Sequence, residues 1–166
     1  MNDWPTRGRL TEFYGNPVNR RDPSKPSQQW ESLALVRVII PWRAVAAWNT
    51  SLVLKSLRVH LKCKESLSRV FARIWEASGQ DQAKIEEWGC HLIGGAYEYR
   101  ATRGGSRLST HAYGCAIDLD PARNKHGDST PNFAEILEVQ DAFAAEGWQW
   151  GGGWPRPDGM HWEAVR

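Results

Sequence analysis

The chain has 166 residues, of which 41% are hydrophobic and 24% charged, a balance that is ordinary for one globular domain and too apolar for global disorder. Its 21 Lys and Arg against 19 Asp and Glu give a net charge of only +2, which argues against nucleic-acid binding by electrostatics. The longest apolar run is far shorter than a membrane span. We therefore expect no nucleic-acid partner and no stable membrane association.

The cysteine pattern excludes a complete disulfide scheme. Cys63, Cys90 and Cys115 are three in number, so one stays unpaired under any pairing, and none belongs to a CxxC motif. This favours free buried thiols and synthesis in a reducing cytoplasm. The opening residues MNDWPTRGRL lack a basic segment followed by an apolar stretch, so we expect no secretory signal.

The first third of the chain predicts an arm followed by two strands. Residues 1–32 are dense in turn formers, with GNPVNRRDPSKPS at their centre, and we expect an extended N-terminal arm wrapped over a single domain of residues 1–166. Residues 33–40 are rich in β-formers and precede Pro41, which predicts a strand that ends there. A weaker strand is expected over residues 52–60.

Helical signals follow. Over residues 66–78 the apolar side chains recur at spacings of three and four, as on one buried helix face, and Gly79 is suited to end that helix. A short helical turn is expected over residues 82–88, ending at Gly89. Residues 92–100 then predict a strand that leads into the loop ATRGGSRLS.

The last third alternates strand and helix. Residues 115–119 have a period of two, which places Asp118 on the opposite face from Ile117. Pro131 is expected to open a helix that runs to about residue 146, before a closing strand over residues 160–165. This order of elements favours an α+β fold: a small single domain with a central, mainly antiparallel sheet flanked by helices.

Two short segments contain metal-ligand residue types, STHAYGCAID at residues 109–118 and PDGMHWEAVR at the C-terminus. His111, Asp118 and His161 supply two imidazoles and one carboxylate, a set that leaves one position open in a catalytic zinc site. If the closing strand pairs beside residues 115–119, His161 lies across from Asp118 and His111 returns from the preceding loop. We predict one zinc ion in a cleft on the sheet.

Further residues near these segments suit hydrolysis. Asp158 lies three residues before His161, from which it can act as general base for a zinc-bound water. Arg100 and Arg103, in EYRATRGGS, are candidates to hold a substrate carboxylate or stabilise an oxyanion. Gly114 and Gly159 remove side chains where backbones must approach closely or adopt a positive φ.

The remaining histidines invite a plainer interpretation. His60, His91 and His126 are expected to be surface or satisfied core residues, with His126 at a loop tip in NKHGD. Glu163 shares a strand face with His161, and the pattern leaves open whether it contacts a metal ligand or the substrate.

The two segments together resemble a known family. Ser109, His111, Gly114, Ala116 and Asp118 fit SxHxxGxAxD, and with the terminal DGMHWE they resemble the M15 zinc peptidases, which include VanY-like D-alanyl-D-alanine carboxypeptidases. The segment GGAYEYRATRGGSRLSTHAYGCAIDLDPARN is most similar to the phage endolysin branch that cuts L-alanyl-D-glutamate bonds. The resemblance spans a motif-bearing core of residues 60–166. It implies the same three zinc ligands, Asp158 as catalytic carboxylate, Arg100 facing substrate and Ser109 hydrogen-bonding nearby.

The resemblance implies a zinc-dependent peptidoglycan peptidase that hydrolyses the L-Ala–D-Glu bond of the stem peptide. One alternative keeps the chemistry but cleaves terminal D-Ala–D-Ala, as a D,D-carboxypeptidase. Another is a non-catalytic, zinc-stabilised binding or virion structural module. For an endolysin we expect a monomer made in the host cytoplasm, which reaches the cell wall or periplasm after release through a holin.

Overall fold

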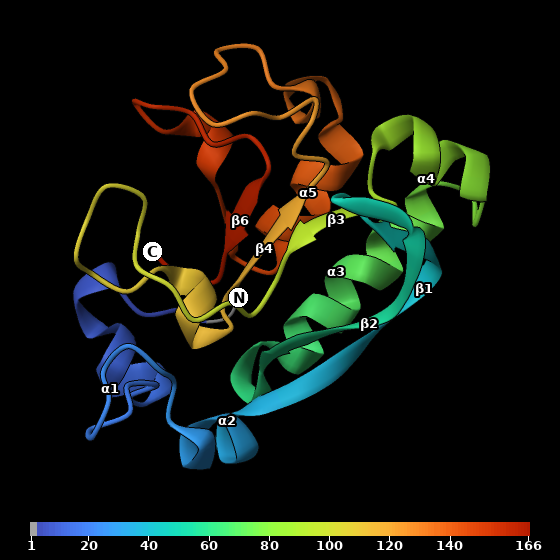
Figure 1. The fold of residues 1–166 in the computed structure, drawn as a ribbon. Helices are drawn as coiled ribbons and strands as arrows, with labels where there is room; N and C mark the ends of the chain where they lie inside the picture. The colour runs from blue at the N-terminus through green and yellow to red at the C-terminus, as the bar shows by residue number, and fades with distance from the viewer. Residues whose placement is uncertain (1–2) are drawn as a thin grey trace.

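A computed structural model describes residues 3–166, and a six-stranded open sheet runs through them (Figure 1). The strand order is β2-β1-β3-β4-β6-β5, and β1 with β3 is the one parallel pair among the strands of residues 3–166. Five α-helices accompany the sheet in this part of the chain. The predicted α+β class and the mainly antiparallel sheet are confirmed.

The first two strands form a long hairpin, β1 over Leu35–Ala46 and β2 over Asn49–His60. The prediction that Pro41 ends β1 was wrong. The pairing between β1 and β2 shifts register between Ile39 and Ala44, so Pro41 lies in an irregular stretch. Because proline has no backbone N–H to donate, such a stretch accommodates it without breaking the strand.

Two helices follow as their patterns predict. Helix α3, Lys64–Ala77, packs on β1 and buries most of its apolar face, Leu67, Val70, Phe71 and Ile74. It ends before Gly79, whose φ of 72° belongs to the left-handed region. Helix α4, Gln82–Trp88, stops at Gly89, also left-handed.

The predicted helix from Pro131 is instead two pieces, a 3-10 turn at Asn132–Glu135 and helix α5 at Leu137–Ala145. Ile136 leaves helical geometry between them, with φ −114° and ψ 81°. The Gln140 side chain donates to the carbonyl oxygens of Phe133 and Ala134 at 2.8 and 3.2 Å. These bonds satisfy carbonyls at the break, so the interruption is tolerated.

The remaining strands are short. Strand β3 covers Leu92–Gly95, less than predicted, and β4 covers Ala116–Leu119. Strand β6, His161–Glu163, pairs with β4 on one side and with β5, Gln149–Trp150, on the other. The closing strand is therefore confirmed in a shorter form, and β5 is a strand that the sequence did not predict.

The N-terminal segment is partly helical rather than extended. It contains a 3-10 turn at Arg7–Arg9 and helices α1, Leu10–Tyr14, and α2, Gln28–Ala34. The Ser27 hydroxyl accepts from the backbone N–H of Trp30 and so caps α2. The expectation of an extended arm was wrong because the density of turn formers obscured this local helix start.

The N-terminal segment packs against the end of the chain. Tyr14 donates its hydroxyl to the carbonyl of Ala164 at 2.7 Å, and the N–H of Arg166 donates to the carbonyl of Pro5 at 2.9 Å. The two ends of the described chain accordingly lie side by side, and the N-terminal segment contacts the residues that directly follow β6.

Two further expectations concern free cysteines and membrane-spanning helices. Cys63, Cys90 and Cys115 are all buried and none is disulfide-bonded within residues 3–166, which confirms the free-thiol prediction. Across the same residues, no helix is both long enough and apolar enough to traverse a bilayer.

His60 is a satisfied core histidine, as expected. The residue is 3% exposed; Nε2 donates to the carbonyl of Tyr14 at 2.9 Å, and Nδ1 accepts from the N–H of Lys62 at 3.1 Å. Burial lowers the pKa of His60 to about 4. The ring is therefore neutral in the folded protein at neutral pH.

His60 should make stability fall with acid. An unfolded histidine binds a proton near pH 6.5, whereas folded His60 does so only near pH 4, so protonation favours the unfolded chain between those values. Between pH 7 and pH 4 the wild-type free energy of unfolding should drop by about 3 kcal/mol more than that of His60→Gln, measured by urea denaturation. Parallel pH profiles for the two proteins would contradict this assignment.

Candidate metal centre

Two neighbouring strands place the first pair of site residues. In the antiparallel ladder of β4 and β6, Asp118 is directly opposite His161. Residues paired in this way have Cβ atoms about 4.5–5.5 Å apart, within reach of a shared ligand. The predicted juxtaposition of these two side chains is confirmed.

His111 comes from a 3-10 turn, Thr110–Tyr113, that precedes β4. The Ser109 hydroxyl accepts from the N–H of His111 at 3.3 Å and so starts the turn. Gly114 ends it with φ 66°, and a Cβ there would lie 2.8 Å from the backbone nitrogen of His60. The close approach expected at Gly114 is confirmed, because both its φ and its surroundings exclude a larger residue.

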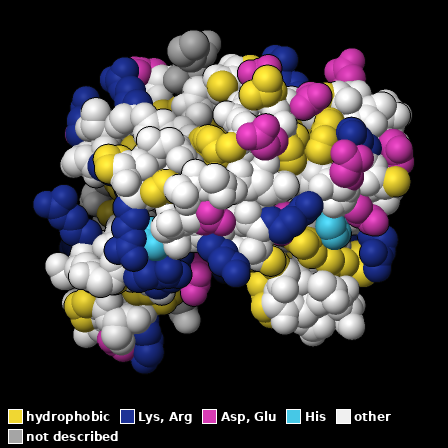
Figure 2. Space-filling view, turned by 90° about the horizontal axis from the view of Figure 1, so that it is seen from above, with side chains coloured by type: hydrophobic (Ala, Val, Ile, Leu, Met, Phe, Trp, Pro, Cys, Tyr) yellow, Lys and Arg dark blue, Asp and Glu magenta, His cyan; other side chains and the backbone are white. Residues whose placement is uncertain are grey.

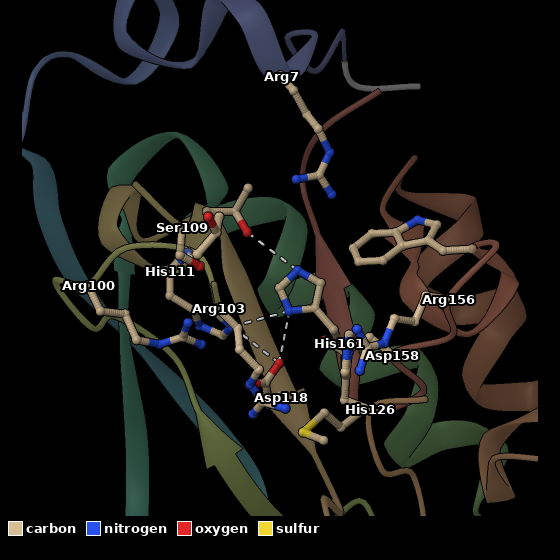
Figure 3. A pocket seen from close by; sticks show the side chains of 14 residues that line it. Arg7, Arg100, Arg103, Ser109, His111, Asp118, His126, Arg156, Asp158 and His161 are labelled. Carbon is tan, nitrogen blue, oxygen red and sulfur yellow. Dashed lines mark hydrogen bonds and ion pairs between the residues drawn. The ribbon is translucent and has the colours of Figure 1, made fainter. Parts of the chain in front are cut away.

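Three ligand atoms converge on one point (Figure 3). His111 Nε2 lies 3.2 Å from His161 Nδ1 and 3.2 Å from Asp118 Oδ1, while His161 Nδ1 lies 2.9 Å from Asp118 Oδ1. A four-coordinate zinc ion with bonds of about 2.0–2.1 Å needs neighbouring ligand atoms about 3.3–3.4 Å apart. The donor types and their spacing therefore fit zinc with shifts of a few tenths of an ångström.

The far side of each imidazole has a partner of its own. His111 Nδ1 donates to the carbonyl of Ala96 at 2.7 Å, and His161 Nε2 donates to Glu163 Oε2 at 3.0 Å. Such outer bonds fix which ring nitrogen faces a metal and hold the ring in place. Here they direct His111 Nε2 and His161 Nδ1 toward the centre.

The charges of the three candidate ligands follow from the same bonds. Burial opposes ionisation of Asp118, but hydrogen bonds from His111 and His161 outweigh it and hold the pKa of that carboxyl well below its usual range. Burial likewise opposes a charged His161, yet the hydrogen bonds to Asp118 and Glu163 raise its pKa to about 9. A cation that binds the triad must displace the Nδ1 proton of His161.

The remaining predicted site residues surround the triad in one pocket of about 250 Å³ (Figure 3). Arg100, Arg103, Ser109 and Asp158 all line it, as predicted by their proximity in sequence to the ligands. Arg100 is partly exposed and donates to Glu98 at 2.9 Å. Ser109 is buried and bonded to the turn of His111, so a substrate role for it stays a prediction.

Asp158 has one carboxylate oxygen that is available to accept a hydrogen bond. Its Oδ1 atom is buried without a hydrogen-bond partner among the residues that the structure describes, while Oδ2 lies 3.5 Å from His126 Nδ1. At Gly159 a Cβ would lie 2.3 Å from that of Pro131, so the backbone after Asp158 needs glycine. An unpaired buried carboxylate oxygen in a pocket is an uncommon feature that suits a proton acceptor.

Sequence reasoning missed other residues of this pocket. His126 does lie in a loop, but its ring faces Asp158 and lines the pocket beside Arg156. Arg7, from the N-terminal segment, lines the opposite wall. Neither NKHGD nor RGR differs from an ordinary surface segment, so no local signal identifies these side chains.

Comparison with known families agrees with the geometry. Residues 103–164 match the peptidase M15 family model described as D-alanyl-D-alanine carboxypeptidase, which supports an M15 metallopeptidase. The matched region contains His111, Asp118, Asp158 and His161. No curated protein and no solved structure matches the chain.

Removal of a triad imidazole should abolish stoichiometric metal binding. His111→Ala and His161→Ala should each lower zinc affinity by more than the roughly 10- to 100-fold that loss of an outer partner causes, because each removes a ligand atom. Competition against a chromogenic chelator measures this. His126→Ala, a histidine of the same pocket outside the triad, is the control that should keep its zinc. Wild-type affinity in either triad variant would contradict the assigned centre.

Proposed function

We propose that this protein is a zinc-dependent peptidase of bacterial peptidoglycan that hydrolyses the L-Ala–D-Glu bond of the stem peptide. The observation that carries the proposal is the position of Asp158: an unpaired carboxylate oxygen shares one pocket with a triad whose geometry fits zinc. The match to an M15 peptidase model supports the same class of reaction.

The chain's own residues divide the work. Zinc held by His111, Asp118 and His161 would supply a Lewis acid that polarises the scissile carbonyl and acidifies water. Asp158 accepts the proton of the attacking water and delivers it to the departing amine. His126 Nδ1, at 3.5 Å from Asp158 Oδ2, limits how that carboxylate turns.

Arginines give the pocket a preference for anionic substrates. Arg7, Arg100, Arg103 and Arg156 line it, against the carboxylates of Asp118 and Asp158. In Figure 1 the loops of residues 120–131 and 151–158 lie at the top and the loop of residues 100–107 lies at the left, and Figure 2, seen from above, shows Lys and Arg side chains gathered beside a histidine. A planar guanidinium binds a carboxylate bidentately. In the stem peptide, the free carboxylate of D-Glu is adjacent to the proposed scissile bond.

The description of the family model favours a second candidate for the scissile bond. Its description is D-alanyl-D-alanine carboxypeptidase, and the C-terminal carboxylate of D-Ala–D-Ala also suits an arginine-lined pocket. The two activities share the metal triad and Asp158 and differ in which carboxylate the arginines hold. Product identity separates them.

The biological setting belongs to the same proposal. The resemblance of residues 60–166 to the phage branch supports an endolysin, made as a monomer in the host cytoplasm and released to the cell wall through a holin. A non-catalytic binding or virion structural module is the less favoured alternative, because such a module has no use for the free oxygen of Asp158 beside a complete triad.

The bond is identified from the products of defined muropeptides. With zinc present, we expect mass spectrometry to find the intact peptide beginning with D-Glu, and the glycan fragment ending in L-Ala. Prior treatment with EDTA should abolish both products, and added zinc should restore them. Release of a single alanine from a pentapeptide substrate would instead establish the carboxypeptidase, and no cleavage of either bond would refute the proposal.

Asp158 should be needed for catalysis and not for metal. In Asp158→Asn the amide cannot accept the proton, so kcat should fall by about 10²- to 10⁴-fold while zinc affinity stays within a few-fold of wild type. Asp141→Asn, which changes an exposed carboxylate on α5, is the matched control. Cleavage of peptidoglycan at the wild-type rate by Asp158→Asn would remove the proposed general base.

A further inference from the structure

Glu163 is a carboxylate that the proposed reaction does not use. It ends β6, two residues after His161, and it is completely buried. Its Oε2 atom accepts from His161 Nε2 at 3.0 Å, and its Oε1 atom accepts from the Arg7 guanidinium. Because a buried carboxylate is stable only when its charge is compensated and its oxygens are bonded, Glu163 depends on both partners.

Arg7 reaches Glu163 from the other end of the chain. It belongs to the 3-10 turn Arg7–Arg9, and Figure 3 shows its side chain pointing from the N-terminal segment into the pocket. The guanidinium also lies 4.9 Å from the centre of the Trp154 ring, and that ring lies 5.5 Å from the imidazole of His161. Two independent contacts therefore fix the Arg7 side chain beside the triad.

No other described side chain near His161 Nε2 could replace Glu163 equally well as its hydrogen-bond acceptor. Thr110 Oγ1 lies 3.4 Å from His161 Nε2, longer than the 3.0 Å of the Glu163 bond, and it carries no charge. Without Arg7, one oxygen of a buried carboxylate would lose its bond and its counter-charge, so Glu163 would be free to turn away from His161.

We infer that Arg7 is a positioning residue of the metal centre: it orients Glu163 and compensates its charge, and Glu163 in turn holds His161 with Nδ1 directed at the metal. The inference rests on the proposed function for the existence of a zinc centre. It extends that centre to the N-terminal segment, outside the matched residues 103–164.

The test measures zinc affinity, with no substrate present. By chelator competition, Arg7→Ala and Glu163→Gln should each bind zinc about 10- to 100-fold more weakly than wild type, the usual effect of losing an outer partner of a metal-bound histidine. The double variant should be little weaker than either single one, because both act through the same bond to His161. Arg9→Ala is the matched control: Arg9 lies on the same turn, is exposed and pairs with Glu12.

Two measurements separate positioning from folding. Thermal unfolding in EDTA reports whether Arg7→Ala is destabilised without metal, and Arg7→Lys, which keeps the charge but lacks the planar fork, should bind zinc with intermediate affinity. In the zinc-loaded proteins, ¹⁵N-edited NMR should show that the proton on His161 Nε2 exchanges with solvent faster in Arg7→Ala than in wild type. A variant that melts earlier but binds zinc as wild type does would overturn the inference.

Failure of the inference is distinct from failure of the proposed function. If wild type binds zinc but cleaves no muropeptide, the proposed reaction is wrong, and weaker zinc binding by Arg7→Ala still upholds the positioning role. If muropeptides are cleaved and Arg7→Ala matches wild type in zinc affinity, only the positioning role is wrong. A wild-type protein that binds no zinc would overturn both.

Discussion

The pairing of β4 with β6 is the constraint on which the rest of the site depends. It places Asp118 opposite His161 and leaves their ligand atoms 2.9 Å apart. A slip of one residue in that register would turn one of the two side chains to the other face of the sheet. Burial on that other face, where Ile117 and Trp162 are almost inaccessible to solvent, fixes the register. The hydrophobic core thus determines the metal geometry.

Around this pair, each element adds one function to the site. The turn before β4 supplies His111, and the irregular segment before β6 supplies Asp158 with its free oxygen. Backbone carbonyls and Glu163 orient the imidazoles from behind, whereas the arginines line the open side. The candidate metal ligands are thereby held in place and the arginines are more exposed, a division that suits a preformed centre.

Much of this was predictable from sequence where the signal is local. The spacing of apolar residues in α3, the glycine stop of α4, and the alternation around Asp118 each reflect short-range geometry, and all three were confirmed. The prediction that Pro41 ends β1 failed because the cost of a missing backbone N–H depends on the pairing with the partner strand, which is irregular there. Arg7 and His126 were not predicted as pocket residues, because their positions depend on contacts to residues 163 and 158 that no neighbouring residue in the sequence indicates.

The contact between Arg7 and Glu163 joins positions 156 apart in the chain. Contacts of such long range form late in folding, since the entropy of closing the intervening chain must first be offset by other interactions. A partly folded chain can possess both imidazoles and the carboxylate and still lack a rigid triad. If Arg7 positions the triad as proposed, high-affinity metal uptake reports that folding is complete, and the centre matures only when the first and last segments of the domain have met.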